Sequence, residues 1–267
     1  MGAFSSYLGQ AQWLTYMTDA YTWRVVWFSW WQACLSTVIS LSAAVLVARA
    51  LARRQSFVGR WLLLRCFSVA LVVPSIIAVF GIILLHGKYG YFNQFWLWLG
   101  GQPQSYVYGL TGILLAHVFF NLPLATRILL QRLDAINAET WRLSSQLGMT
   151  SVDLWRHIEW PHIKGVLPQL AALVFALCFT SFAIVMTLGG GPKATTIEVA
   201  IFQAIRFDFD IAKAVYLSLL QMGFCGFILW AGLRLGKPID MFVSLETSAK
   251  NMRPDLKPVL GIVSDSA

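Results

Sequence analysis

The stretch Val25–Ala48, VVWFSWWQACLSTVISLSAAVLVA, runs for 24 residues without a charged side chain. An α-helix needs roughly 20 apolar residues to cross the hydrocarbon layer of a bilayer. Because backbone amides in lipid must pair within their own segment, a run of this length predicts a helix. Four more uncharged runs reach that length: Cys66–Leu85, Tyr106–Thr126, Gly165–Pro192 and Ala214–Leu233. The sequence therefore predicts an all-α, polytopic membrane protein with five visible spans.

The overall composition excludes a soluble domain. Of the 267 residues, 58% are hydrophobic and 12% are charged, whereas a soluble domain carries about 25% charged residues. The cysteines lie inside the apolar runs and lack a CxxC spacing, so we interpret them as small apolar side chains and expect no metal site. They are Cys34, Cys66, Cys178 and Cys225.

The positive charges predict the orientation of the chain. The net charge is +8. With the N-terminus placed outside, fifteen of the 20 lysines and arginines fall on the inner side of the membrane and five on the outer side. This asymmetry follows the positive-inside rule, so the basic balance indicates topology and we expect no nucleic-acid partner. The five outer residues are Arg24, Lys88, Lys193, Arg206 and Lys213.

The two ends of the chain look incomplete for a membrane domain. Residues 1–24 contain no long apolar run and do not form a signal peptide, so we expect an extracytoplasmic N-terminal segment. Residues 25–237 form the predicted transmembrane domain. Residues 238–267 are polar, and we interpret them as a cytoplasmic tail or as the linker to a missing second half. An odd number of spans with such ends suggests a fragment.

A few polar residues interrupt the apolar runs. His117 and Asn121 lie in the third run and Gln221 in the fifth. Polar groups at that depth normally face protein or a cavity, so these three are candidates for a translocation path. The alternative for each is a hydrogen bond to a neighbouring helix. Pro74 lies in the middle of the second run and predicts a kink there.

Two short helices are predicted in the outer segments. The aromatic stretch Tyr91–Leu99 is typical of an interfacial helix. Thr195–Arg206 predicts another. Asp208 and Asp210 follow it, and they either meet a partner protein or cap the last span.

The inner segment 133–164 is too polar to enter the bilayer and is patterned as two short helices. Glu139–Leu147 predicts the first, and Gly148 is placed to stop it in the left-handed conformation. Thr150 is placed to cap the second helix with Asp153 as its acidic partner. Pro161 is expected to end that helix. The pair predicts a knob on the cytoplasmic face.

This segment resembles the cytoplasmic coupling loop of ABC importer permeases. In that family Glu-Ala-Ala is followed after three residues by Gly, after nine more by Ile, and after one more by Leu-Pro. Gly148, Ile158 and Pro161 match this pattern in register, while Trp160 stands in place of Leu. The Glu-Ala-Ala start is not matched; its positions hold Arg142, Leu143 and Ser144.

Two further stretches narrow the resemblance. LAHVFFNLP at Leu115–Pro123 and LGGGPKATTIE at Leu188–Glu198 are similar to the N-terminal half of the thiamine transport permeases of Gram-negative bacteria. The resemblance covers about residues 20–237. That family joins two homologous six-span halves in one chain, so the resemblance implies that the first span and the second half are absent here.

The resemblance implies a multi-pass subunit of the bacterial inner membrane that imports thiamine or its phosphates. The implied partners are a cytoplasmic ATP-binding subunit dimer, a periplasmic substrate-binding protein, the second permease half and the lipid bilayer. No catalytic residue and no cofactor is implied, because a separate subunit hydrolyses ATP. The residues implied to couple to that ATPase are Arg142, Leu143, Ser144, Gly148, Asp153, Ile158 and Pro161.

Other functions remain open from the residues alone. Related permeases of the same plan carry ferric iron or other small solutes. A secondary transporter or channel predicts buried ionisable residues along the path, and the runs offer only His117. A haem-bearing membrane anchor would need His86 and His117 as ligands. His157, Glu159 and His162 suit either a metal site or a solvated docking face, and the docking face explains the charges.

Overall fold

The computed structural model describes residues 15–54, 56–102, 106–189, 191 and 194–236. The predicted tail 238–267 and residues 1–14 of the N-terminal segment lie outside the described residues. The described part is helical and contains no strand. Its helices are α3 (Ala20–Arg53), α4 (Arg60–Val72), α5 (Ser75–His86), α6 (Tyr91–Trp98), α7 (Leu110–Asp134), α8 (Ala138–Gln146), α9 (Ser151–Leu154), the π-turn η1 (Trp155–Glu159), α10 (Trp160–Lys164), α11 (Leu167–Phe179), α12 (Phe182–Leu188), α13 (Ile197–Arg206) and α14 (Ile211–Leu235).

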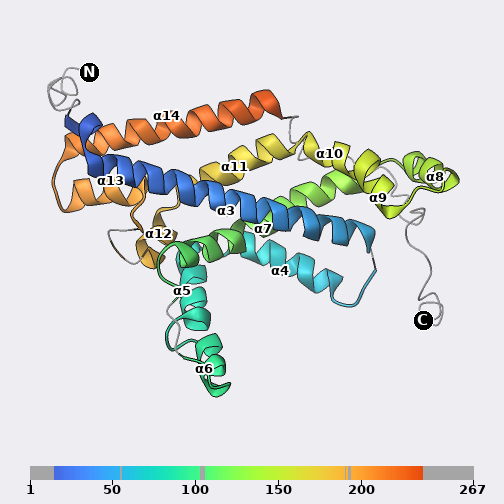
Figure 1. Ribbon diagram of the computed structural model, residues 1–267, viewed down its shortest axis with the longest axis horizontal. Coiled ribbons are helices and arrows are strands. Elements are labelled where there is room, and N and C mark those ends of the chain that lie inside the picture. The colour runs from blue at the N-terminus through green and yellow to red at the C-terminus, as the bar shows by residue number, and fades with distance from the viewer. Residues whose placement is uncertain (1–14, 55, 103–105, 190, 192–193, 237–267) are drawn as a thin grey trace.

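The long helices form a bundle. Helices α3, α7, α11 and α14 run side by side along the length of the molecule (Figure 1). Helix α3 packs against α7 and α11, and α14 packs against α11 and α13. The buried face of α3 repeats a small residue every four positions, which allows the backbones of neighbouring helices to approach closely. These residues are Ser36, Ser40, Ala44, Ala48 and Ala52.

The structure has four to five candidate membrane spans, against the five predicted, and their extents differ. Four stretches are long and apolar enough to cross a membrane, and a bent pair makes a fifth if it counts as one span. Much of their apolar surface is exposed within the chain, as lipid-facing helices require. The four are Ala20–Arg53, Ser75–Trp98, Leu110–Asp134 and Ile211–Leu235, and the bent pair is Ser151–Lys164 with Leu167–Phe179, at 54°.

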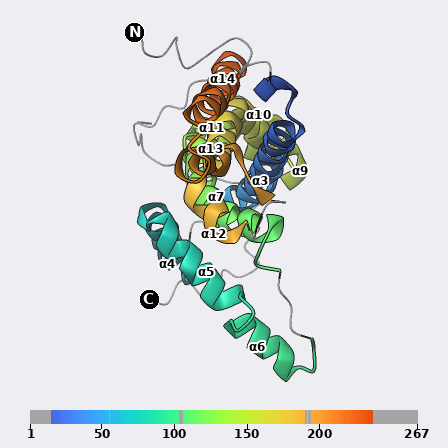
Figure 2. The same cartoon turned by 90° about the vertical axis from the view of Figure 1, so that its left-hand side faces the viewer.

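The second predicted run, Cys66–Leu85, is broken rather than kinked. Helix α4 ends at Val72, Val73 is extended, and α5 begins after Pro74. Proline has no N–H to continue the helix, and its ring disfavours the helical conformation at the preceding residue. Helices α5 and α6 therefore leave the bundle and project from its side (Figures 1 and 2).

The prediction that Gly165–Pro192 forms one continuous span is wrong. Helix α11 ends at Phe179, and α12 starts in a new direction after Thr180 and Ser181. The Thr180 hydroxyl donates to the Ala176 carbonyl at 2.9 Å, and the Ser181 hydroxyl donates to Cys178 at 2.9 Å. The Ala176 carbonyl also accepts from the Thr180 amide at 3.0 Å, and the Cys178 carbonyl also accepts from the Gln32 side chain at 3.0 Å, so these carbonyls are satisfied where the helix ends. Helix α11 thus ends without proline.

The predicted outer helices are present as α6 and α13. Helix α3 starts at Ala20, five residues before the predicted span, because the Asp19 carboxylate accepts bonds from the Tyr21 and Thr22 amides and caps it. Helices α8 to α10 lie at the opposite end of the bundle from α13 (Figure 1). The two candidate functional regions are thus that far end and the interior of the bundle.

Candidate functional site

Gly148 ends α8 as the sequence predicts. Its φ is +61°, in the left-handed region. Its amide donates to the Ser145 carbonyl and the Met149 amide donates to Ser144, each at 3.1 Å, which is the bonding pattern of a Schellman motif. A Cβ at Gly148 would meet no atom within 4 Å, so backbone conformation rather than space requires glycine here.

The predicted cap of the second helix is also confirmed. The Asp153 amide donates to the Thr150 hydroxyl at 3.4 Å, and the Thr150 amide donates back to the Asp153 carboxylate at 3.1 Å. The Thr150 hydroxyl also donates to that carboxylate at 2.6 Å. The hydrogen bond from the Thr150 side chain has the largest effect and lowers the pKa of Asp153, and the bond from the Thr150 backbone lowers it further. A capping box therefore fixes the start of α9 directly after the turn at Gly148.

The prediction that Pro161 ends the second helix is wrong. The helix widens into the π-turn η1 over Trp155–Glu159, and α10 continues from Trp160 to Lys164. The Trp160 amide reaches back five residues to the Trp155 carbonyl. A wider turn leaves room for the Pro161 ring and needs no amide from it. The proline therefore lies inside the helical segment.

The predicted coupling residues divide into an outer and an inner set. Leu143 exposes 59% of its surface. Leu147 and Val152, which were not among the predicted residues, expose 76% and 72%, so the tip of this loop carries apolar side chains that nothing in the described chain covers. Arg142, Gly148 and Pro161 are also exposed, and Asp153 is half-buried. Ser144 and Ile158 are instead buried, Ile158 within the main core and Ser144 with its hydroxyl donating to the Thr140 carbonyl.

Glu159 does not belong to a solvated docking face, and that prediction is wrong for this residue. Its side chain is fully buried and pairs with Arg49, Nε to Oε2, at 2.8 Å. His157 and His162 bond through Nδ1 to the carbonyls four residues before them, Asp153 and Ile158. Among the described residues no group of three side chains suited to a metal ion occurs.

A cavity of about 440 Å³ lies where the two broken runs meet α7. Val73 and Ser75 line it from the break between α4 and α5, and Thr180 and Ser181 from the break between α11 and α12. His117 and Asn121, both predicted as path residues, line it from α7 together with apolar side chains. The apolar side chains are Leu71, Phe120, Leu124, Leu177, Phe182, Ala183 and Ile184.

His117 joins three helical segments beside this cavity. Its Nδ1 lies 2.8 Å from the Ser36 hydroxyl of α3, and its Nε2 lies 2.7 Å from the Ser181 hydroxyl. The single Ser181 proton already goes to the Cys178 carbonyl. Ser181 therefore accepts from His117 Nε2–H, and the Ser36 hydroxyl bonds Nδ1 on the other side of the ring. The imidazole thus bridges α3 and the break after α11.

The other predicted path residues have different surroundings. Asn121 donates to the Cys178 sulfur at 3.2 Å and faces the same cavity. Gln221 does not line it; this side chain donates to the Glu198 carboxylate at 2.6 Å and links α14 to α13. His86 also lies away from the cavity lining. Its Nδ1 lies 2.6 Å from the Tyr106 hydroxyl and its ring stacks on Phe92, so it does not share a site with His117.

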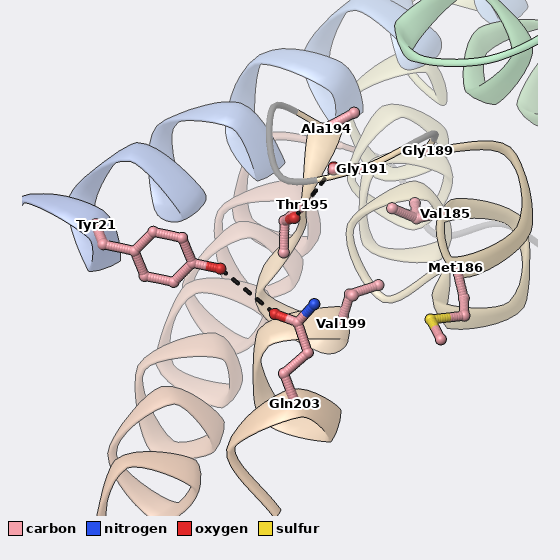
Figure 3. A pocket seen from close by; sticks show the side chains of 9 residues that line it. All are labelled: Tyr21, Val185, Met186, Gly189, Gly191, Ala194, Thr195, Val199 and Gln203. Atoms are coloured by element: carbon pink, nitrogen blue, oxygen red, sulfur yellow. Dashed lines mark hydrogen bonds between the residues drawn. The ribbon is translucent and has the colours of Figure 1, made fainter. Parts of the chain in front are cut away.

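Sequence reasoning missed a pocket of about 270 Å³ at the outer end of the bundle (Figure 3). The Tyr21 hydroxyl of α3 donates to the Gln203 side chain of α13 at 3.4 Å across this pocket.

Asp210 caps α14 by accepting from the Lys213 amide, which confirms the prediction that this residue caps the last span. Burial, and then the hydrogen bond to Asp210, raise the pKa of Tyr16.

Comparison with known proteins gives a family and close relatives. Residues 36–234 match the family described as binding-protein-dependent transport system inner membrane component. The chain is 51% identical to the thiamine transport system permease protein ThiP of Salmonella typhimurium, over 85% of this chain and 42% of that one. The corresponding Escherichia coli protein is 49% identical over 86% of this chain and 43% of its own length. The chain spans less than half the length of these relatives.

Solved structures share the fold. A bacterial ABC transporter that imports the acidic polysaccharide alginate contains a chain with a TM-score of 0.71 and 14% identity, covering 84% of this chain and 83% of its own. An alginate ABC transporter in complex with its alginate pentasaccharide-bound periplasmic protein gives a TM-score of 0.74 at 14% identity, over 89% and 87% of the two chains.

Proposed function

The chain belongs to the family of binding-protein-dependent transport system inner membrane components, and from this we propose that it forms one half of the permease of an ATP-driven importer for thiamine or its phosphates. It is a multi-pass protein of the inner membrane. The observation that supports thiamine as the substrate is the identity of 46–51% to thiamine permeases over 83–86% of the chain. The chain itself performs no covalent chemistry in this proposal.

Three partners complete the proposed importer. A periplasmic binding protein delivers the substrate to the outer end of the bundle. A second permease half closes the path. A cytoplasmic ATP-binding subunit dimer receives the loop tips of the two halves in grooves. The exposed apolar side chains of Leu143, Leu147 and Val152 support this last contact, because a groove would remove them from water.

The coupling role is assigned to the loop between α7 and α11. ATP binding draws the two loops together and hydrolysis lets them separate, which rocks the two halves around the path. Gly148 and the capping box of Thr150 and Asp153 fix the direction of the loop tip. Ile158 anchors the loop in the core, and Pro161 lies where the loop joins the bundle.

The translocation path is proposed to pass the cavity beside His117 and Asn121. Broken helices near the middle of the membrane commonly mark the substrate site of a transporter. Two breaks meet at this cavity. Gln221 is proposed to support the α13–α14 pair instead of the path.

The proposal is tested by uptake of labelled thiamine in cells whose gene is deleted and then restored. We expect uptake to fall to background on deletion and to recover on restoration. Unchanged thiamine uptake together with lost ferric iron uptake would favour the alternative substrate, which a ferric permease of Haemophilus influenzae, 25% identical, represents. Thiamine uptake that persists after ATP depletion, with ion gradients intact, would favour a secondary transporter.

A further inference from the structure

Arg49 extends from the inner end of α3 to the loop that follows α7. Its Nε donates to the Glu159 carboxylate at 2.8 Å, and one terminal nitrogen donates to the Ser151 carbonyl at 3.1 Å. Its guanidinium carbon lies 4.6 Å from the centre of the Trp155 ring. One side chain of α3 therefore holds three residues of the loop by three kinds of contact.

The three contacted residues share one face of the loop helix. Ser151, Trp155 and Glu159 are spaced by four positions, and such residues lie above one another on a helix. Ser151 begins α9, and Trp155 and Glu159 begin and end the π-turn. Arg49 thus lies along the whole second half of the loop and binds it as one unit. The planar guanidinium suits this arrangement, whereas a lysine ammonium could not reach all three partners.

Burial makes the ion pair between Arg49 and Glu159 costly to separate. The Glu159 side chain is fully buried and Arg49 is 26% exposed. A fully desolvated carboxylate is strongly destabilised without its partner, so separation of Arg49 from Glu159 during movement of the loop is disfavoured. The pair therefore favours joint movement of the loop and the inner end of α3.

Helix α3 also contacts a residue that lines the cavity. Ser36 lies thirteen residues before Arg49, which is about 20 Å along the helix axis. Its hydroxyl bonds to His117, and His117 donates to Ser181 at the break after α11. Between these points α3 packs closely on α7 through its small buried residues.

We propose that Arg49 is a positioning residue that makes α3 move with the coupling loop, so that a displacement at the ATPase contact reaches the cavity at Ser36 and His117. This rests on the proposed function. The family pattern leaves position 159 open, between Ile158 and the residue before Pro161, so the pattern itself does not assign this role to Glu159.

The test compares two variants of the full importer reconstituted with its ATPase and binding protein. Arg49→Met/Glu159→Leu removes both charges together, so neither charge of the pair stays buried without the other. Arg54→Gln, at the exposed C-cap of α3, is the control. In the double variant we expect thiamine transported per ATP to fall roughly two- to thirtyfold, the range for substitutions along coupling networks, while ATP hydrolysis persists. A ratio equal to that of the control would overturn the proposal.

A second measurement does not depend on the substrate. With the native cysteines replaced by alanine, spin labels are placed at Leu46→Cys on α3 and at Arg156→Cys on the loop, both exposed positions. With Arg49 and Glu159 intact we expect the same label distance with and without ATP. The double variant should show a shifted or broadened distance with ATP. An ATP-dependent shift in the intact pair would sink the proposal, and absent thiamine uptake by the wild type would refute only the proposed substrate.

Discussion

At the scale of single residues, Gly148 shows how a backbone conformation can be required without any steric contact. Its φ of +61° is open to glycine and, at low cost, to asparagine. The absence of neighbours within 4 Å of a Cβ separates the conformational effect from crowding. Substitution at this position therefore tests the direction of the loop tip alone.

Gly148→Val is expected to uncouple ATP hydrolysis from transport. A β-branched residue in the left-handed region costs at least about 1–2 kcal/mol, which depopulates the turn roughly five- to thirtyfold. Uptake should fall in that range while basal hydrolysis continues, measured in the reconstituted importer. Gly148→Asn is the matched control and should retain coupling. Normal uptake with normal substrate-stimulated hydrolysis in the valine variant would contradict this role.

Residues paired across the fold were the hardest to predict. Arg49 directly follows an apolar run, as basic residues at the cytoplasmic end of a membrane span do. Glu159 lies between two histidines in a polar loop. Nothing local connects residues 110 positions apart, so the sequence analysis placed Glu159 on a solvated face and did not predict its pairing with Arg49. By contrast, the roles of Gly148 and Thr150 depend only on neighbours within a few positions, and both were predicted correctly.

At the scale of elements, helix ends without glycine or proline escaped prediction. Pro74 marked the break between α4 and α5, although as a kink. At the break between α11 and α12 the Thr180 and Ser181 hydroxyls bond carbonyls of the helix before them. Threonine and serine make such bonds inside continuous helices as well, so their presence predicts no end. The π-turn likewise has no local sequence signature, and so Pro161 was misread.

The capping box makes the start of α9 sensitive to substitution. Thr150→Ala removes an N-cap oxygen, a loss of about 1 kcal/mol, and we expect amide hydrogen exchange at Ser151–Leu154 to quicken roughly fivefold. Ser145→Ala, exposed on α8, is the control. Equal exchange in the two variants would show that the cap does not hold this helix.

The same box predicts a pH dependence. The pKa of Asp153 is lowered in the folded loop. The stability that its ionised carboxylate contributes to the start of α9 is therefore present at neutral pH and is lost as the pH falls through that lowered value. Protection of these amides should therefore decline on acidification, beyond the intrinsic change in exchange rate. The decline should be absent in Asp153→Asn.

At the scale of the whole molecule, the fold class and the number of spans followed from composition and run length, because lipid imposes both. The arrangement of the helices did not follow. Which faces pack together depends on buried small residues of α3 and on bonds such as that of His117, and these become visible only when distant segments are brought together. The cavity between the two breaks was therefore not predicted as a unit.

Assembly with the ATPase depends on the apolar loop tip. In Leu143→Asp/Leu147→Asp we expect co-purification of the ATP-binding subunit to be lost, because two buried carboxylates would face an apolar groove. Both side chains are exposed in the chain itself, so the permease should still fold. Gln131→Asp, exposed on α7, should co-purify normally. Retention of the ATPase by the double variant would place the contact elsewhere.

The π-turn also determines how a deletion of one residue would affect this part of the chain. A π-turn closes its ring over one residue more than an α-turn does. Deletion of one residue within Trp155–Glu159 would restore ordinary α-helical spacing and leave the downstream helix facing nearly the same way, because five residues at π spacing turn the chain about as far as four at α spacing. The buried faces of α10 and α11 would then stay buried. Homologous chains should therefore be able to differ by one residue in length at this turn.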